Sequence, residues 1–113
     1  MKPSLIDTDI LSLFLSKNQE VISYFDSYLQ AFNELNISIL AYYEIISGLY
    51  YKDAKNKLQL FDEFSLCLNI IPINEKSAKK SAEIYSLLRK KGIMLADIDI
   101  LIAGIAVSNT ISH

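Results

Sequence analysis

The sequence has few of the residues that mark specialised classes of protein. It contains 1 cysteine, 3 glycines and 2 prolines, which excludes an internal disulfide framework, a cysteine-rich zinc site and a collagen-like chain. Its apolar runs are interrupted well before bilayer-spanning length, so no transmembrane helix is expected. Lys2 is the only basic residue before an apolar segment that already carries Asp7 and Asp9, which does not match a secretory signal. We therefore expect a cytoplasmic protein.

The remaining composition is typical of one globular domain. Hydrophobic residues make up 51% of the 113 residues and charged residues 21%, which argues against disorder. This length allows one compact core, so we expect a single domain over residues 1–113. The 11 basic and 13 acidic residues give a net charge of -2, whereas domains that coat nucleic acid are usually basic. Any contact with nucleic acid must therefore depend on local features such as a metal ion.

Strand-like and helix-like segments alternate along the chain. The spacing of apolar residues predicts helices at about residues 10–15, 19–33, 41–51, 54–64, 75–91 and 97–108. Apolar, β-rich runs predict short strands at residues 4–6, 36–39 and 68–73. This alternation predicts an α/β domain with a short parallel sheet flanked by helices. The functional crevice of such a sheet lies at the carboxyl ends of its strands.

Local signals refine these elements. The side-chain oxygen of Thr8 or Asp9 can cap the first helix, and Asn74 can cap the fifth, which ends at Gly92. The last helix is apolar almost all round after its first turn, which is typical of a helix buried against a sheet or a partner. The residues expected to be buried by the fifth helix are Ala78, Ala82, Tyr85 and Leu88.

Five acidic residues stand in unusual positions, after the first two predicted strands and at the start of the last helix. They are Asp7, Asp9, Glu44, Asp97 and Asp99. The ends of parallel strands would place Asp7 and Glu44 on one rim. Carboxylates brought together repel one another unless a cation neutralises them. Hard oxygen ligands without matching His or Cys suit Mg²⁺ or Mn²⁺, and a water on such an ion can attack a phosphodiester.

These acids also have purely structural explanations. Asp7 and Asp9 can cap the first helix and interact with its dipole, and Asp97 and Asp99 can do the same for the last helix. Glu44 is harder to explain in this way, because its neighbours are apolar and aromatic. The spacing alone therefore leaves both a metal site and simple helix capping open.

The order of the motifs resembles a known family. Segments 5–12, 37–48 and 73–103 are similar, in this order, to three blocks of PIN-domain nucleases, particularly the VapC-type toxins of prokaryotic toxin–antitoxin modules. The resemblance covers essentially the whole chain. It implies a PIN-like fold and an endoribonuclease that uses Mg²⁺ or Mn²⁺ to hydrolyse RNA. It also implies a cognate antitoxin as protein partner, and dimerisation is common.

The resemblance assigns roles to individual acids. It implies that Asp7, Glu44 and Asp99 are the principal catalytic and metal-binding residues. It implies an additional metal ligand at Asp97. Asp9 stands where the family has Asn or Asp and is expected to support the site.

Thr8 and the end of the chain complete the comparison with the family. Thr8 stands where the family has a threonine, whose hydroxyl is expected to orient Asp7. The family continues past the last helix into a further strand with another polar metal-site residue, whereas this sequence ends at His113. We therefore expect the final strand to be missing and the sheet edge beside Asp7 to be open to a second copy or a strand-completing partner.

The sequence also suggests alternatives to an active nuclease. One is a catalytically inactive or truncated PIN-like module that binds an antitoxin or oligomerises. The other is a haloacid-dehalogenase-like phosphatase, which also uses Asp-x-Asp after a first strand. That family expects Thr or Val two residues after the second acid, where this chain has Leu11, so the phosphatase is disfavoured.

Basic and aromatic clusters offer further contacts. Lys52, Lys55 and Lys57 form one basic cluster, and residues 89–91 form another shortly before Asp97. The second cluster either contacts an RNA backbone or completes a solvated helix end. Tyrosines near Glu44 either stack on bases or, more often, pack in a core or interface, and these are Tyr42, Tyr43, Tyr50 and Tyr51.

Overall fold

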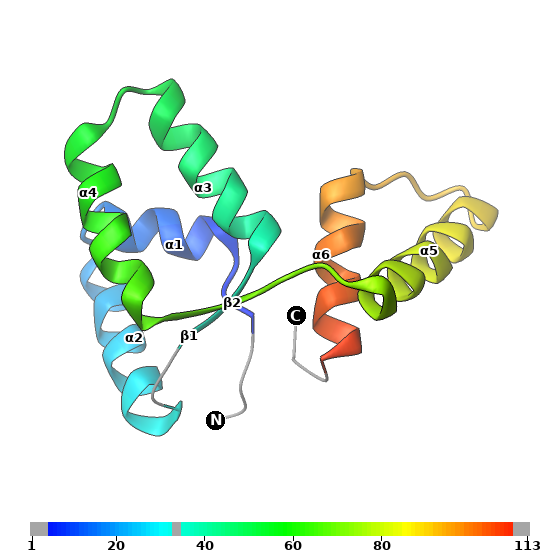
Figure 1. Ribbon diagram of the computed structural model, residues 1–113, viewed down its shortest axis with the longest axis horizontal. Coiled ribbons are helices and arrows are strands. Elements are labelled where there is room, and N and C mark those ends of the chain that lie inside the picture. The colour runs from blue at the N-terminus through cyan, green and yellow to red at the C-terminus, as the bar shows by residue number, and fades with distance from the viewer. Residues whose placement is uncertain (1–4, 33–34, 110–113) are drawn as a thin grey trace.

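Helices make up most of the structure, and a short parallel sheet lies between two groups of them (Figure 1). The computed structural model describes residues 5–32 and 35–109. In chain order the elements are α1 (Thr8–Leu15), α2 (Gln19–Phe32), β1 (Leu35–Ser38), α3 (Ile39–Tyr51), α4 (Lys55–Phe64), a 3₁₀ turn η1 (Ser65–Cys67), β2 (Leu68–Ile71), α5 (Glu75–Lys90) and α6 (Asp97–Ser108). The alternation of strands and helices agrees with the predicted order.

The sheet is parallel, as predicted, but it is smaller than expected. β1 and β2 pair over their full lengths. The predicted first strand is reduced, among the described residues, to one parallel bridge between Leu5 and Asn36. The Ile6 N–H donates to the Asn36 carbonyl across 2.8 Å beside this bridge. The segment that leads into Asp7 therefore runs beside β1, and its end lies at the same edge of the sheet as the end of β1.

A buried polar pair sets the register of the two strands. Asn36 and Asn69 stand opposite each other, and the Asn69 Nδ2 donates to the Asn36 Oδ1 across 2.9 Å. The Asn36 Nδ2 lies 3.5 Å from the Tyr28 hydroxyl. A slip of one residue would separate the two amides and leave a buried polar group unpaired, which costs free energy.

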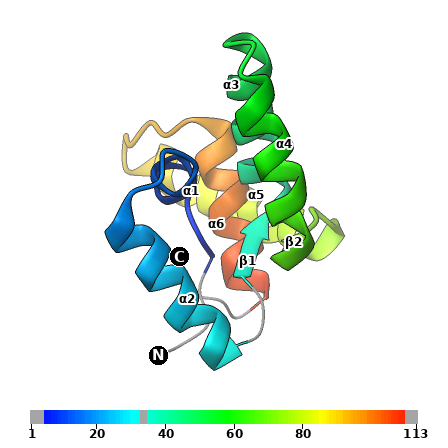
Figure 2. The same ribbon diagram turned by 90° about the vertical axis from the view of Figure 1, so that its left-hand side faces the viewer.

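Helices cover both faces of the sheet (Figures 1 and 2). On one face, α1 to α4 surround the main core, in which Phe25, Tyr28 and Phe61 are fully buried. On the other face, α6 packs against the strands, and α5 lies along α6. The core on this second face is small and consists of Leu5, Ile71, Ile105 and Ala106.

The observed boundaries correct several predicted ones. β1 ends at Ser38 because the Ser38 hydroxyl accepts from the Ala41 N–H across 3.0 Å and starts α3. β2 ends at Ile71, directly before Pro72. Asn74 caps α5 as predicted, in a reciprocal capping box with Ser77, a pairing that satisfies two free N–H groups at once.

The buried face of α5 was predicted wrongly. Its inward residues are Ser77 and Ser81, which lie against Gly104 of α6. A Cβ atom on Gly104 would lie 2.7 Å from the Ser77 carbonyl oxygen and would overlap the Ser81 side chain. The two helices approach closely because all three residues are small. The apolar residues of α5 that were expected to be buried face away from α6. Of the residues expected inside, Leu88 is half-buried and the exposed ones are Ala78, Ala82 and Tyr85.

Two further predictions concern the membrane and the end of the chain. Over residues 5–32 and 35–109, no helix combines the length and the apolar character needed to cross a bilayer. The prediction of a missing final strand concerns the end of the chain, where residues 110–113 lie outside the described part.

Candidate functional site

An acidic cavity of about 890 Å³ lies between α1, the start of α3 and α6. Asp7, Glu44 and Asp99, the three principal acids of the sequence prediction, all line it, and so does Asp9. Asp97 does not line this cavity. Residues two apart on a helix point to different sides, so Asp97 and Asp99 cannot both face it in the same way. The fold thus brings together acids that are up to 92 positions apart in the sequence.

Asp7 enters the cavity from the start of α1. Its backbone is extended, and its Oδ1 accepts from the Ile10 N–H across 2.9 Å, which makes Asp7 the N-cap of the helix. The prediction that Thr8 or Asp9 caps α1 is therefore wrong by one or two residues. The structural explanation of Asp7 is correct in part, but only one of its two oxygens makes this hydrogen bond. The carboxylate stays exposed and its second oxygen is available to a ligand.

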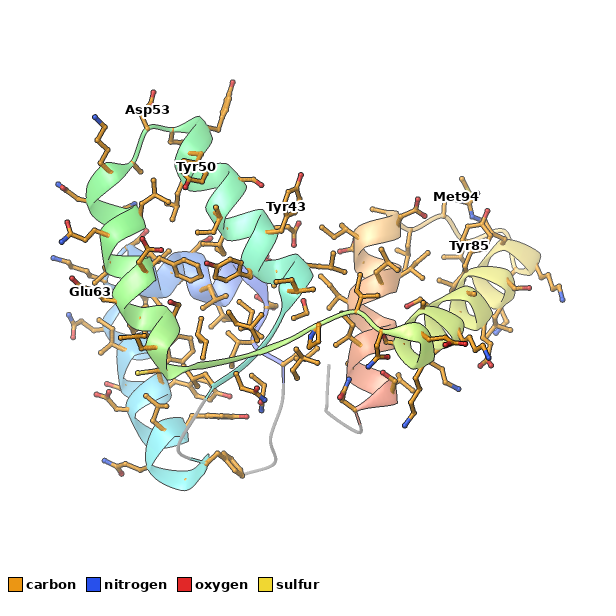
Figure 3. All side chains as sticks on the ribbon, in the orientation of Figure 1. Tyr43, Tyr50, Asp53, Glu63, Tyr85 and Met94 are labelled. Atoms are coloured by element: carbon orange, nitrogen blue, oxygen red, sulfur yellow. The ribbon has the colours of Figure 1, made fainter. Side chains whose placement is uncertain are left out.

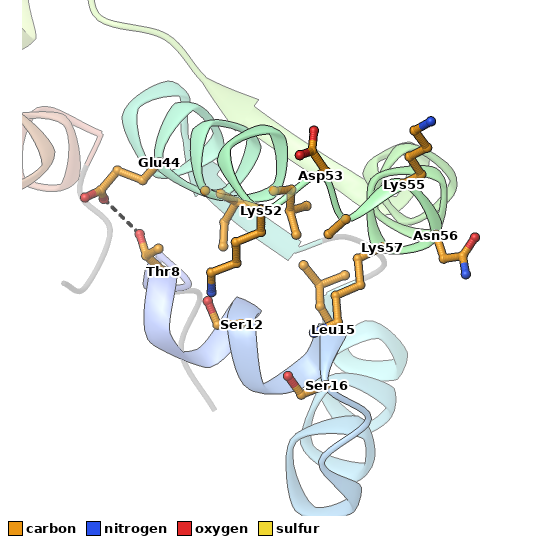
Figure 4. Close-up of a pocket in the computed structure, with 14 residues that line it drawn as sticks. Thr8, Ser12, Leu15, Ser16, Glu44, Lys52, Asp53, Lys55, Asn56 and Lys57 are labelled. Atoms are coloured by element: carbon orange, nitrogen blue, oxygen red, sulfur yellow. Dashed lines mark hydrogen bonds between the residues drawn. The ribbon is translucent and has the colours of Figure 1, made fainter.

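Glu44 reaches the cavity from α3 and is tied to α1. The Thr8 Oγ1 donates to the Glu44 Oε1 across 2.9 Å (Figure 4). The resemblance implies that Thr8 orients Asp7, whereas its hydroxyl in the structure holds Glu44. Glu44 is half-buried, so this hydrogen bond restricts its carboxylate more than a hydrogen bond to an exposed side chain would.

Asp99 comes from the first turn of α6. The residue that precedes this helix, Ala96, has no side chain that could cap it. Asp97 and Asp99 therefore supply the negative charge at its N-terminus, where carboxylates interact favourably with the helix dipole. Both side chains are exposed. Asp99 additionally lines the cavity, whereas Asp97 does not.

None of the described residues that line the acidic cavity is basic. The ion pairs in the described part of the chain are Lys79–Glu75 and Lys80–Glu83, both on the surface of α5. A set of unneutralised carboxylates favours a bound cation. The donor atoms are hard oxygens, which suit Mg²⁺ or Mn²⁺.

The geometry of the acids limits how such an ion would be held. No group of three or more potential metal ligands converges within the described residues. Magnesium usually takes only one or two carboxylates and keeps several of its waters. The described residues therefore do not form a closed cage of three direct ligands, and a magnesium ion held here would have to keep most of its waters.

Three residues of α2 were not predicted to belong to this cavity. Glu20, Val21 and Tyr24 all line it. Glu20 stands in the first turn of α2 among polar neighbours, where sequence reasoning expects an ordinary solvated side chain. Only the packing of α2 against α1 brings it to the site, so no local signal could have identified it.

Solved structures resemble this chain, although no protein-family model and no curated protein matches it. A DNA-bound VapBC from Salmonella typhimurium matches with a TM-score of 0.86 and 22% identity, over 98% of this chain and 83% of that chain. VapBC2 from Rickettsia felis, bound to a DNA fragment from its promoter, matches with a TM-score of 0.84 and 23% identity, over 96% of this chain and 83% of that chain. VapBC-1 from Haemophilus influenzae matches with a TM-score of 0.78 and 24% identity, over 96% of this chain and 81% of that chain.

The fold is one found in VapBC complexes. The match extends over nearly all of this chain in each case. It therefore includes every element that contributes to the acidic cavity, from the start of α1 to the first turn of α6.

Proposed function

We propose that this chain is a PIN-type, VapC-like toxin, an endoribonuclease that hydrolyses RNA phosphodiester bonds with Mg²⁺ or Mn²⁺. The observation that carries the proposal is that Asp7, Glu44 and Asp99, from three separate elements, line one cavity. No basic side chain of the described residues pairs with them. The fold shared with VapBC complexes supports the same function.

The charge of the chain favours the toxin role over the antitoxin role. Two of the similar complexes are bound to DNA, and a component that contacts DNA is expected to be basic. This chain has a net charge of -2, and its largest described cavity is acidic. We therefore propose an antitoxin as its protein partner and RNA as its substrate.

Each acid would have a distinct part in the reaction. Asp7, Glu44 and Asp99 would hold the divalent ion, directly or through water, and the ion supplies positive charge for the phosphate and an activated water. The hydrogen bond to Ile10 fixes the orientation of Asp7, and the hydrogen bond from Thr8 does the same for Glu44. Within the described residues the Asp99 side chain makes no such hydrogen bond, so its position depends on where α6 packs.

The test is RNA cleavage by purified variants in the presence of Mg²⁺ or Mn²⁺. Asp7→Asn, Glu44→Gln and Asp99→Asn are each expected to lower the rate by roughly 10²-fold or more, the scale of losing one catalytic group. Asp26→Asn, which removes an exposed carboxylate of α2 outside the cavity, is the matched control and should cleave like the wild type. Undiminished cleavage by Asp7→Asn and Glu44→Gln would rule the proposal out.

Asp7 allows the charge and the capping role to be separated. Asn caps helices about as well as Asp, so Asp7→Asn should keep the free energy of unfolding within about 0.5 kcal/mol while cleavage is lost. Asp7→Ala removes the cap as well and should cost about 0.5–2 kcal/mol. Equal stability of the two variants in urea denaturation would show that the Ile10 hydrogen bond contributes nothing.

A second candidate function is a catalytically inactive module of the same fold that only binds an antitoxin or oligomerises. It is favoured by the observation that no three potential ligands converge among the described residues. Titration with Mn²⁺ in a calorimeter separates the two candidates. Binding that is lost in Asp7→Asn supports the nuclease, and absence of binding by the wild type supports the inactive module.

A further inference from the structure

Three cavities lie one after another along α1, beginning with the acidic one. The second, of about 500 Å³, shares Thr8 and Glu44 with the acidic one and lies between α1, α3 and the start of α4. The third, of about 470 Å³, shares Leu15 and Ser16 with the second. This row of adjacent cavities, called the groove below, extends from the N-terminal end of α1 to its C-terminal end.

The charge of this groove reverses along its length. One end carries the carboxylates described above, and the other end is lined by lysines. Lys52 and Lys55 line the second cavity together with Asp53, Lys17 lines the third, and Lys57 lines both. These four lysines are exposed. In the described part of the chain none of them forms an ion pair, since both ion pairs lie on α5. Their charges are available to an anion.

The lysines at the end of α3 and the start of α4 point in different directions (Figure 4). Lys52 extends towards Ser12 on α1, and Lys57 extends towards Leu15. Lys55 and Asp53 line the same cavity but point away from α1. Of the three lysines of the basic cluster, Lys52 and Lys57 are therefore the two that extend towards α1.

We propose that Lys52 and Lys57 form a second phosphate subsite for single-stranded RNA, separate from the bond that is cleaved at the acidic end. The inference rests on the proposed nuclease function. α1 has eight residues and is about 12 Å long. The RNA backbone would run along α1, with one phosphate at the acids and another at the lysines.

The chemistry of the groove favours RNA over an acidic protein segment. Ser12 and Ser16 lie on the α1 side of the same cavity and are exposed. Lysine and serine side chains are among the groups that contact phosphate and sugar in nucleic-acid complexes. A phosphate at the acidic end is repelled unless a cation is present, so in metal-free protein the lysines supply the attraction for RNA.

The experiment measures binding of a fluorescein-labelled octauridylate to the full chain by anisotropy, in EDTA so that no metal-dependent cleavage occurs. The test variant is Lys52→Gln/Lys57→Gln. The matched control is Lys76→Gln/Lys79→Gln, which removes the same charge from two exposed lysines of α5 that line none of the three cavities. Thermal unfolding of both variants confirms that they fold.

The two variants should differ in affinity and in salt dependence. Two lost phosphate contacts should lower the slope of log affinity against log salt concentration by about 1.4 and weaken binding roughly tenfold or more at 0.1 M salt. The control should retain the wild-type slope. In Mg²⁺, with a mixed-sequence octaribonucleotide pool, the test variant should raise KM and leave kcat unchanged, because these lysines do not touch the reacting bond.

The outcomes separate this inference from the proposed function. If the test and control variants bind RNA with equal affinity and equal salt dependence, the subsite is overturned. If both variants still cleave RNA in that case, the nuclease proposal remains intact. Retained RNA binding together with lost binding of a polyglutamate peptide also overturns the subsite, in favour of a protein occupant. Lysine-dependent RNA binding supports the subsite, and if no form of the protein cleaves RNA, the nuclease proposal alone fails.

Discussion

The two faces of the sheet are packed in different ways. On the face covered by α1 to α4, twelve buried residues form the main core of the described structure. The rings of Phe14, Phe25 and Phe64 stack or tilt against one another there, with centroids 4.3 to 5.8 Å apart. On the other face, α6 meets the strands through only four buried apolar residues.

The α5–α6 hairpin is held by close backbone approach more than by apolar burial. Ser77 and Ser81 of α5 lie against Gly104 of α6. Large apolar side chains of the hairpin, including Tyr85 and Met94, are exposed (Figure 3). Apolar area removed from water is the main favourable contribution to folding, so this hairpin contributes less stability for its size than α1 to α4.

This difference matters for the acidic cavity. Asp7 and Glu44 belong to helices that enclose the main core, whereas Asp99 belongs to the hairpin. The face of the sheet with the smaller core therefore supplies Asp99, the third acid of the site. The position of Asp99 relative to the other two depends on how α6 packs against the sheet, and mutations can test this dependence separately from the main core.

The largest loss of stability is expected in the main core. Phe61 is fully buried and lies 5.5 Å from the Tyr42 ring, measured between centroids, so Phe61→Ala should lower the free energy of unfolding by about 3–5 kcal/mol. Ile105→Ala, at an equally buried position of the small core, should cost less, about 2–3 kcal/mol. Urea denaturation measures both. An equal or larger loss for Ile105→Ala would contradict the proposed difference between the two faces.

A smaller loss, with an effect on the site, is expected from Gly104→Ala. The new Cβ would lie 2.7 Å from the Ser77 carbonyl oxygen, so the helices must separate at a cost of about 1–3 kcal/mol. Mn²⁺ affinity should fall as Asp99 moves. Gly48→Ala is the control, because nothing lies within 4 Å of its Cβ position and alanine favours a helix by about 0.5–1 kcal/mol. If the free energy of unfolding changed in the same direction for Gly104→Ala and Gly48→Ala, close packing of the hairpin would be contradicted.

The smallest effect is expected from Ser81→Ala. The Ser81 hydroxyl is buried and has no hydrogen-bond partner among the described residues, so its removal should stabilise the protein by up to about 1 kcal/mol. Ser77→Ala is the matched change, because the Ser77 hydroxyl completes the capping box with Asn74 and its loss should cost about 0.5–2 kcal/mol. The midpoint of thermal unfolding should rise for Ser81→Ala and fall for Ser77→Ala. A destabilised Ser81→Ala would show that the Ser81 hydroxyl has a hydrogen-bond partner.

Local features were predicted well because their causes are local. The helix expected at 97–108 has the bounds of α6, and Asn74 caps α5 as expected, because caps and apolar spacing act within a few residues. The end of β2 before Pro72 also has a local cause, although the strand was predicted to continue to residue 73. The first strand was predicted as a full element but forms one bridge among the described residues, since pairing depends on a distant partner.

The sequence by itself determined which acids could matter, because Asp7 and Glu44 follow β-rich segments and Asp99 opens an apolar helix. Only the tertiary structure decided that Asp99, and not Asp97, faces the cavity. It also decided that Thr8 holds Glu44 and that Lys52 and Lys57 lie over the groove. The physical reason is that a residue's type and spacing fix the helix it belongs to, while the neighbouring helices and strands fix the side of that helix which faces inward.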